Sequence, residues 1–432
     1  MTDKAKMDTL NDRVVNGWNP PSDRFIDKFK YVLIGVGPTA LAAGMSMGPG
    51  SINSTLQLGA YAGYSQAYLI LLAALFTGLS SYVTNYIMIG SHEPGEPAMT
   101  AIQLYRKQLG KPITLLISVP VSVAFWFIIL SQSMLLGAVI NALIPAIPVN
   151  VAVLLGGPLL AFIFARDFDG LKKLFSAAAG LLTLIFFINA LIIKPDFVAL
   201  FKGFIPSLPE PGPASIAWGG VVGGSVVGGV YIAHSFAQRN MGFTETKHLK
   251  LIKWDVVVMY ILFFVWSIGI FISGAQVLNP AGIEIDNILQ AAMALEPVAG
   301  SFAKNFMLIG ILGSLITCIG GMSTINTYIA TDILGGEPDF DKNNKMKYGI
   351  IAHCLLVSFG IVFSKIAPVK LVVYTLAINT VCGPLVCLAS LYMLCKKGVM
   401  KIESPLWMKG VVLVVFILNC YAVYNTAVGL FG

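Results

Sequence analysis

The sequence predicts an all-α polytopic membrane protein in which ten spans form two halves of opposite orientation and an eleventh span follows. Three observations lead to this fold class. The 432 residues are 56% hydrophobic and only 11% charged, and their mean hydropathy is +0.80, whereas soluble domains carry about a quarter charged residues. Many apolar stretches approach or exceed the roughly 20 residues that cross a bilayer. Lysine and arginine gather in alternate loops, as the positive-inside rule requires.

Each half contains five predicted spans, and polar segments separate the parts of the chain. Residues 1–30 form a cytoplasmic polar tail, 31–193 the first half, 194–214 an extracellular connection, 215–395 the second half, and 396–432 a loop with the last span. The predicted spans are 31–63, 66–90, 112–143, 149–165, 172–193, 215–241, 252–277, 301–333, 347–364, 368–395 and 406–430. We also expect a short surface helix within 97–109, and a connection that its prolines make stiff but without a fold of its own.

The distribution of basic residues sets the expected orientation. With the amino terminus inside, the only basic loop residues on the outer side are Lys194, Lys202, Lys304, Lys365 and Lys370. We therefore expect a cytoplasmic amino terminus and an extracytoplasmic carboxyl terminus in the plasma or inner membrane. Because five is odd, the two halves are inverted relative to each other. The net charge of +7 reflects this loop bias and does not indicate a nucleic-acid partner.

Several other classes of protein are disfavoured. The sequence offers no Ser/His/Asp set, no paired carboxylates within a span and no phosphate-binding loop, so we do not expect an enzyme. No apolar core of a signal peptide is found in the polar first thirty residues. The cysteines lack CxxC spacing and are expected to be buried free thiols; they are Cys318, Cys354, Cys382, Cys387, Cys395 and Cys420.

Two predicted spans are interrupted by glycine and proline. In the first span the interruption is Gly48-Pro49-Gly50, and in the sixth it lies among the glycines of residues 219–230. Backbone groups freed in hydrocarbon cost several kcal/mol each, so such a break persists only where it lines a protected cavity. Interrupted spans in corresponding halves indicate a secondary transporter with its site near the midplane. The alternative is that these glycines only allow close helix packing.

Short motifs along residues 31–395 resemble the NRAMP family of proton-coupled divalent-metal transporters. They are Gly37-Pro38, Gly48-Pro49-Gly50, the stretch Leu56 to Tyr64, Phe168 to Leu174, Lys194 to Phe197, Tyr231 to Ser235, and Met322 to Asn326. The resemblance implies the LeuT-type architecture, a five-plus-five inverted repeat with an eleventh helix. It also implies alternating access of a solute to the two sides of the membrane.

The metal-binding residues of that family are missing from this sequence. Where the family has Asp-Pro-Gly-Asn, this chain has Gly48-Pro49-Gly50-Ser51, and the family's sixth-span Met and His fall on Val227 and Gly229. Its acidic third-span positions fall on Ser131 and Met134, and its tenth-span Gln falls on Leu376. Independently of any family, all 21 acidic residues lie in the tail, in loops or at span ends. A divalent cation that has lost its water would therefore find no anionic ligands in the middle of the membrane.

From this absence the sequence predicts a small organic solute, amino-acid-like or carboxylated, as substrate. Backbone amides at the first break would hold a carboxylate, carbonyls at the second would receive an amine, and the lack of large side chains would enlarge the pocket. The candidate binding residues are Gly48, Pro49, Gly50, Ser51, Asn53, Ser54, Val227, Gly228, Gly229 and Tyr231. The alternatives are a divalent cation, Mg²⁺ or Mn²⁺ and possibly hydrated, and a receptor that does not transport.

Further polar residues could couple transport to an ion or line the cavity. His234 is a candidate proton carrier, or else a packed, hydrogen-bonded histidine. Ser323 and Thr324 could hold Na⁺, although hydroxyls often bond back to their own helix. Gln132 and Asn379 are candidates for the cavity wall, with interhelical hydrogen bonding as the alternative. The expected partners are the solute and the lipid bilayer, with H⁺ or Na⁺ as coupling ion and no cofactor.

Overall fold

The computed structural model is almost entirely helical, as the sequence predicts. It describes residues 17–431 apart from 21, 35–45, 93–95, 97–98, 166–167, 208, 210–211, 226–227, 284–291, 293–295, 340–342, 344 and 364–367. The first half contains α2 (Phe25–Ile34), α4 (Pro49–Ala62), η2 (Gly63–Gln66), α5 (Ala67–Gly90), α6 (Ala101–Leu109), α7 (Lys111–Leu143), α8 (Val149–Phe164) and α9 (Phe168–Ile192). After α10 (Phe197–Lys202) come α11 (Pro213–Ser225), α12 (Gly228–Asn240), η3 (Thr246–His248), α13 (Leu249–Ser273), η4 (Gly274–Leu278), α15 (Glu296–Ile333), α16 (Lys345–Phe359), η5 (Gly360–Phe363), α17 (Pro368–Cys395) and α18 (Leu406–Phe431).

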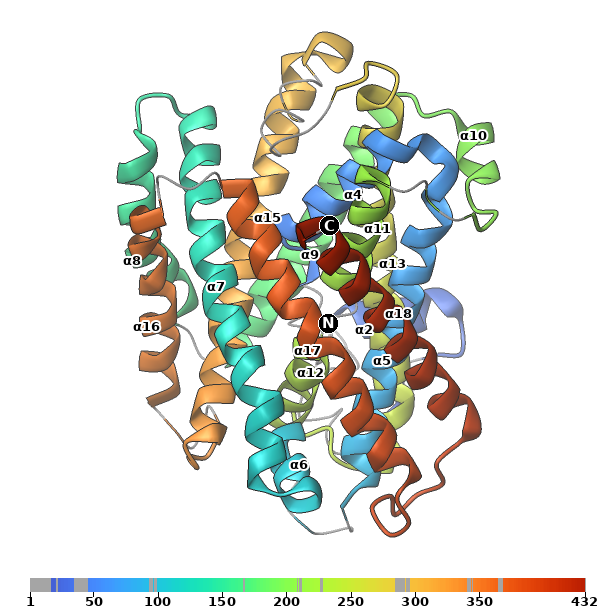
Figure 1. Cartoon of the computed structure of the whole chain (residues 1–432). Coiled ribbons are helices and arrows are strands. Elements are labelled where there is room, and N and C mark those ends of the chain that lie inside the picture. Colours follow the sequence, from blue (N-terminus) through green and yellow to red (C-terminus); the bar gives the residue numbers. More distant parts are fainter. Residues whose placement is uncertain are drawn as a thin grey trace.

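The long helices follow the predicted spans closely. Seven described segments are long and apolar enough to cross a membrane, and α8 and the stretch 381–395 are shorter apolar helices. The second span, expected over 66–90, is α5, and the third, expected over 112–143, is α7. The predicted surface helix is α6, whose amino end is closed by a capping box between Thr100 and Gln103. Pairs of long helices pack side by side, for example α8 with α16 and α17 with α18 (Figure 1).

The connection between the halves differs from the prediction, because part of it is helical. In α10, the Asp196 side chain accepts a hydrogen bond from the Ala199 backbone N–H at 3.0 Å, which caps the first turn. Leu200 on this helix is buried in the cluster that includes Tyr68 and Trp218. An N-cap and one apolar anchor therefore give this segment a helix that proline content alone does not predict.

Close backbone contact holds α4 against the helix pair α13 and η4. A Cβ added to Gly59 would lie 2.4 Å from the Phe271 carbonyl oxygen, and one added to Gly274 would lie 2.2 Å from that of Leu56. Such distances are shorter than real carbon–oxygen contacts, so only glycine permits this approach. This contact fixes the interrupted first span against the middle of the bundle.

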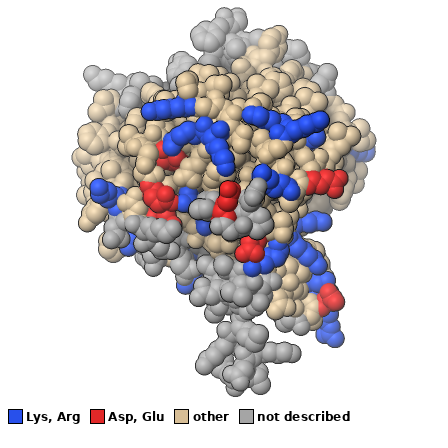
Figure 2. Space-filling view, turned by 90° about the horizontal axis from the view of Figure 1, so that it is seen from below, with Lys and Arg blue, Asp and Glu red and all other residues tan. Residues whose placement is uncertain are grey.

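One end of the molecule is rich in basic side chains. Figure 2 shows the face seen from below in Figure 1, the end at which α6 lies, and lysine and arginine outnumber the acidic residues visible on it. The exposed sides of the long helices are instead apolar, with exposed Leu155, Phe162, Leu184 and Phe359 among others. An apolar belt between polar ends is what a bilayer requires.

Candidate functional site

The first interruption predicted from the sequence is the start of α4. Gly48 precedes this helix in an extended conformation (φ −85°, ψ 167°), and Pro49 occupies its first turn. Gly48, Pro49 and Gly50 are all buried, and Gly48 provides no side-chain cap. The first N–H groups of a helix have no partner within it, so α4 presents its positive end to the protein interior.

The second predicted interruption falls between α11 and α12, at residues 226–227, which lie outside the described residues. The first of these helices ends at Ser225 and the second begins at Gly228; the predicted site residue Val227 lies outside the described residues. The first predicted break is thus a helix start inside the protein, and the second stays a prediction.

The structure brings the start of α4 beside α11. The Ser51 hydroxyl on α4 donates a hydrogen bond to the Gly224 carbonyl oxygen on α11 at 3.2 Å, although the residues are 173 positions apart. The first turn of α4 therefore lies beside the last described turn of α11. We define this region, around Gly48–Ser54 and the end of α11, as the break junction.

Glycines at the break junction also serve packing. A Cβ on Gly220 would lie 2.5 Å from the Ser54 Oγ, and one on Gly224 would lie 3.0 Å from the Ser51 Oγ. The alternative interpretation of the sixth-span glycines, that they allow helices to approach closely, therefore holds for these two positions. The predicted interruption itself lies at residues 226–227, outside the described residues.

Among the polar side chains of the break junction, Asn53 differs from its neighbours. The Ser54 hydroxyl donates to the Gly50 carbonyl oxygen at 3.0 Å, within its own helix. Asn53 is only 7% exposed, and its Oδ1 has no hydrogen-bond partner among the described residues. A buried amide oxygen without a partner is costly, which points to a ligand or water as its missing partner.

The start of α12 contradicts one expectation. The lack of large side chains at Gly228 and Gly229 was expected to enlarge the pocket. A Cβ on Gly229 would instead lie 2.2 Å from the Phe125 Cζ, because the ring of this α7 residue occupies the space beside the glycine. The prediction is wrong at this position, since a neighbouring helix fills the volume that the missing side chain leaves.

Two further candidates, Tyr231 and His234, lie on α12. Tyr231 is buried, and its hydroxyl lies near Ser80 on α5 and Cys387 on α17. His234, one turn further, is fully buried, and neither ring nitrogen has a hydrogen-bond partner among the described residues. The interpretation of His234 as a packed, hydrogen-bonded residue is therefore not supported by the contacts that the structure describes.

The remaining candidates are mostly used in structural contacts. The Thr324 hydroxyl donates to the Gly320 carbonyl oxygen at 2.8 Å, within α15, and Ser323 lies beside the Cys354 thiol. The Gln132 Nε2 donates to the Cys318 sulfur at 3.3 Å and so links α7 to α15. Asn379 lies on α17, but its side chain is outside the described residues. The structural alternatives considered for Thr324 and Gln132 are thus the ones observed.

Sequence reasoning missed one buried polar link near this region. The Ser122 hydroxyl on α7 donates to the Asn326 Oδ1 on α15 at 2.6 Å, and the Nδ2 of the asparagine has no described partner. The available signal was the spacing of Ser118 and Ser122, which places two hydroxyls on one face of the third span. The link joins α7, whose Phe125 contacts Gly229, to α15.

A cation at the break junction would meet neutral oxygen atoms. Within the described part of the chain, no three His, Cys, Asp or Glu side chains come close enough together to hold a metal ion. The Asn53 Oδ1, the carbonyl oxygens at the end of α11 and water remain as possible ligands. Oxygen ligands of this kind suit hard cations such as Mg²⁺.

A bundle of long apolar helices, in which one span begins at an interruption inside the protein, is typical of membrane transport proteins built on discontinuous helices. The model of the natural resistance-associated macrophage protein-like family, Nramp, matches residues 39–428. The chain belongs to this family.

Several curated relatives are divalent metal cation transporters named MntH. The protein of Caldanaerobacter subterraneus is 31% identical over 39% of this chain and 42% of its own length. That of Deinococcus radiodurans is 22% identical over 66% of each chain. That of Yersinia pestis is 23% identical over 74% of this chain and 78% of its own. The chain therefore spans less than two thirds of the length of the first two relatives.

Solved structures share the fold over nearly the whole chain. A manganese transporter of Eremococcus coleocola superposes with a TM-score of 0.78 at 16% identity, covering 96% of this chain and 91% of its own. MHP1, a nucleobase-cation-symport-1 family transporter, gives a TM-score of 0.58 at 12% identity, covering 91% of this chain and 93% of its own. These likenesses establish the LeuT-type fold that the family resemblance implied.

The comparisons overturn the prediction of an amino-acid-like or carboxylated organic substrate. The family match and relatives that carry divalent metal cations favour the alternative reading. The prediction was wrong because it assumed an ion stripped of all water and gave most weight to the N–H groups of α4. The Gly224 carbonyl oxygen of α11 also lies beside α4, and an ion that keeps part of its water needs fewer protein ligands.

Proposed function

We propose that this protein is a secondary transporter of a divalent metal cation, Mg²⁺ or Mn²⁺, which passes the break junction with part of its hydration shell. Membership of the Nramp family and the divalent-cation transporters among the relatives support this proposal. The protein is in this view a transporter and not an enzyme.

The observation that carries the proposal is the unpartnered Asn53 Oδ1 in the second turn of α4. This oxygen is buried, neutral and without a partner among the described residues. Mg²⁺ loses water reluctantly and is commonly held by one or two protein oxygens with several waters retained. Water molecules between the ion and the carbonyl groups of α11 would spread the charge without a carboxylate.

Transport assays with matched variants at neighbouring positions test this role. In proteoliposomes, Asn53→Ala is expected to raise the KM for Mg²⁺ or Mn²⁺ about ten-fold, which equals a loss of about 1.4 kcal/mol in binding free energy. Ser54→Ala is the control, because the Ser54 hydroxyl bonds within its own helix. Loss of function in both variants alike, or transport of neither cation by the unaltered protein, would contradict the proposal.

We propose that protons drive the transport through His234, with Na⁺ beside Ser323 as the alternative. A buried imidazole with no described partner can take up and release a proton as its surroundings open and close. His234→Gln is expected to abolish the acceleration of uptake by a proton gradient while leaving downhill metal flux measurable. If a sodium gradient drives uptake instead, and the variant responds normally, the assignment to His234 fails.

We place the amino terminus and the basic end of the molecule in the cytoplasm. The face in Figure 2, with its excess of lysine and arginine, supports this orientation in the plasma or inner membrane. Labelling of single introduced cysteines from either side of sealed vesicles is the direct measurement.

A further inference from the structure

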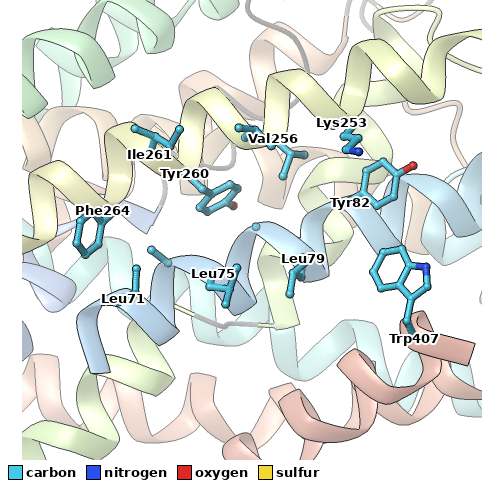
Figure 3. A pocket seen from close by; sticks show the side chains of 13 residues that line it. Leu71, Leu75, Leu79, Tyr82, Lys253, Val256, Tyr260, Ile261, Phe264 and Trp407 are labelled. Atoms are coloured by element: carbon cyan, nitrogen blue, oxygen red, sulfur yellow. The ribbon is translucent and has the colours of Figure 1, made fainter. Parts of the chain in front are cut away.

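A groove runs along the outside of the bundle between α5 and α13. Its volume is about 460 Å³. Figure 3 shows its walls, with side chains of α5 on one side, side chains of α13 on the other and Trp407 of α18 at one end. The lining residues are Leu71, Ala74, Leu75, Gly78, Leu79, Tyr82, Lys253, Val256, Val257, Tyr260, Ile261, Phe264 and Trp407.

The groove opens toward the membrane. Leu71, Leu75 and Ile261 are 45%, 50% and 51% exposed, on helical segments long and apolar enough to cross a bilayer. Its floor is formed by small or buried residues, among them Ala74 and Gly78 of α5 opposite Tyr260. Lipid hydrocarbon therefore contacts this surface. The groove can hold more of an acyl chain than a flat helix face can.

The length of the groove matches one leaflet. From Leu71 to Tyr82 on α5, and from Lys253 to Phe264 on α13, the walls each extend over twelve residues, whose ends are about 16 Å apart along the helix at 1.5 Å rise per residue. Half of a hydrocarbon core is about 15 Å thick. An acyl chain lying along the groove would thus reach from the membrane surface to the bilayer centre.

Polar and aromatic groups lie together at one end of the groove. The rings of Tyr82 and Trp407 stack with their centroids 6.3 Å apart and their planes at 12°. In Figure 3 Lys253 lies at this same end, beside Tyr82. Lys253 is exposed, and no described residue forms an ion pair with it. Aromatic rings of this kind prefer the headgroup level, and a lysine there attracts anionic lipid.

We propose that this groove binds one anionic phospholipid from the leaflet on the Lys253 side. One acyl chain lies between α5 and α13, the glycerol region contacts Tyr82 and Trp407, and the phosphate pairs with the Lys253 ammonium. The combination of an apolar channel one leaflet long with an unpaired cation at its membrane-surface end selects this class of ligand over a free solute.

The test measures lipid binding to the purified full chain by native mass spectrometry and by thermal shift. The probes are phosphatidylglycerol, phosphatidylcholine with the same acyl chains, and inorganic phosphate. We expect one retained phosphatidylglycerol and a raised Tm, weaker binding of phosphatidylcholine, and no effect of phosphate. Lys253→Gln should reduce the preference for phosphatidylglycerol about five-fold, the effect of one basic residue at an anionic membrane surface.

Matched variants separate the groove from the general membrane surface. Leu75→Trp should block binding of the lipid, whereas Leu184→Trp, at an exposed leucine of α9, should not. Lys345→Gln, at an exposed lysine that begins α16, is the control for the charge. If Leu75→Trp does not yield folded protein, Val257→Trp on the opposite wall replaces it.

Three results would overturn the proposal. Equal binding of the two lipids by the unaltered protein would remove the role of charge. A Tm increase with phosphate alone would indicate an anion site without an acyl chain. Equal loss of binding in Leu184→Trp and Leu75→Trp would show that the lipid is not held in the groove.

Discussion

At the scale of single residues, neighbouring polar side chains of the break junction have different uses. Ser51 links α4 to α11, Ser54 bonds within α4, and Asn53 keeps an unpartnered oxygen. All three lie within the first six residues of α4. Because the three side chains are similar in polarity, their different uses follow from the groups that surround each of them in the folded bundle.

A substitution at Gly229 tests the packing side of this region. Gly229→Ala places a methyl group against the Phe125 ring, so we expect a loss of about 1–3 kcal/mol in the free energy of unfolding. Phe125→Leu in the same chain should recover part of this loss, because residues in contact do not act additively. Thermal or denaturant unfolding in detergent measures both. Equal stability of Gly229→Ala and the unaltered protein would show that the ring moves aside freely.

At the scale of elements, a set of polar contacts ties the basic end of the bundle together. The Thr100 hydroxyl before α6 donates to the Asp332 carboxylate on α15 at 2.5 Å, and Arg106 donates to the backbone oxygen of Asp332 at 2.6 Å. The Ser235 hydroxyl on α12 accepts a hydrogen bond from the Ala101 N–H at 3.0 Å. The short helix α6 therefore joins α12, which follows the second interruption, to α15.

Removing the central charge of these contacts should loosen this end. In Asp332→Asn the buried carboxylate that receives Thr100 and pairs with Arg106 is lost, and we expect about 1–3 kcal/mol of destabilisation. Glu337→Gln is the control, because its ion pair with Arg239 lies at the exposed rim, where such pairs contribute at most about 1 kcal/mol. Unfolding midpoints and the uptake rate report the difference. If Glu337→Gln has the larger effect, α6 is not held through Asp332.

At the scale of the whole molecule, binding of the transported cation should raise the free energy of unfolding. A cation that binds the folded protein and not the unfolded chain stabilises it by about 1.4 kcal/mol at ten times its Kd. Titration of Mg²⁺ and of Mn²⁺ against the thermal unfolding midpoint gives this curve directly. Asn53→Ala should move the curve to higher concentration, whereas Leu75→Trp, in the lipid groove, should leave it in place. An identical curve for Asn53→Ala would argue against a metal contact at that oxygen.

Much of the fold was predictable because its signals are local. The span expected over 66–90 is Ala67–Gly90, and that expected over 112–143 is Lys111–Leu143, since continuous apolar runs end at polar or glycine residues. The start of α4 at Pro49 follows from the missing N–H of proline. The helix α10 was missed, because its cap and its anchor Leu200 depend on the rest of the bundle.

The sequence by itself determined a polytopic helical bundle with two interrupted spans, since hydropathy and proline act on their own stretch of chain. Only the tertiary structure decided which oxygens meet at the interruptions, which ring fills the space beside Gly229, and where α5 and α13 leave a groove. These features depend on contacts such as that of Ser51 with Gly224, which are 173 positions apart. No local pattern encodes such a pair, because it exists only when the helices have packed.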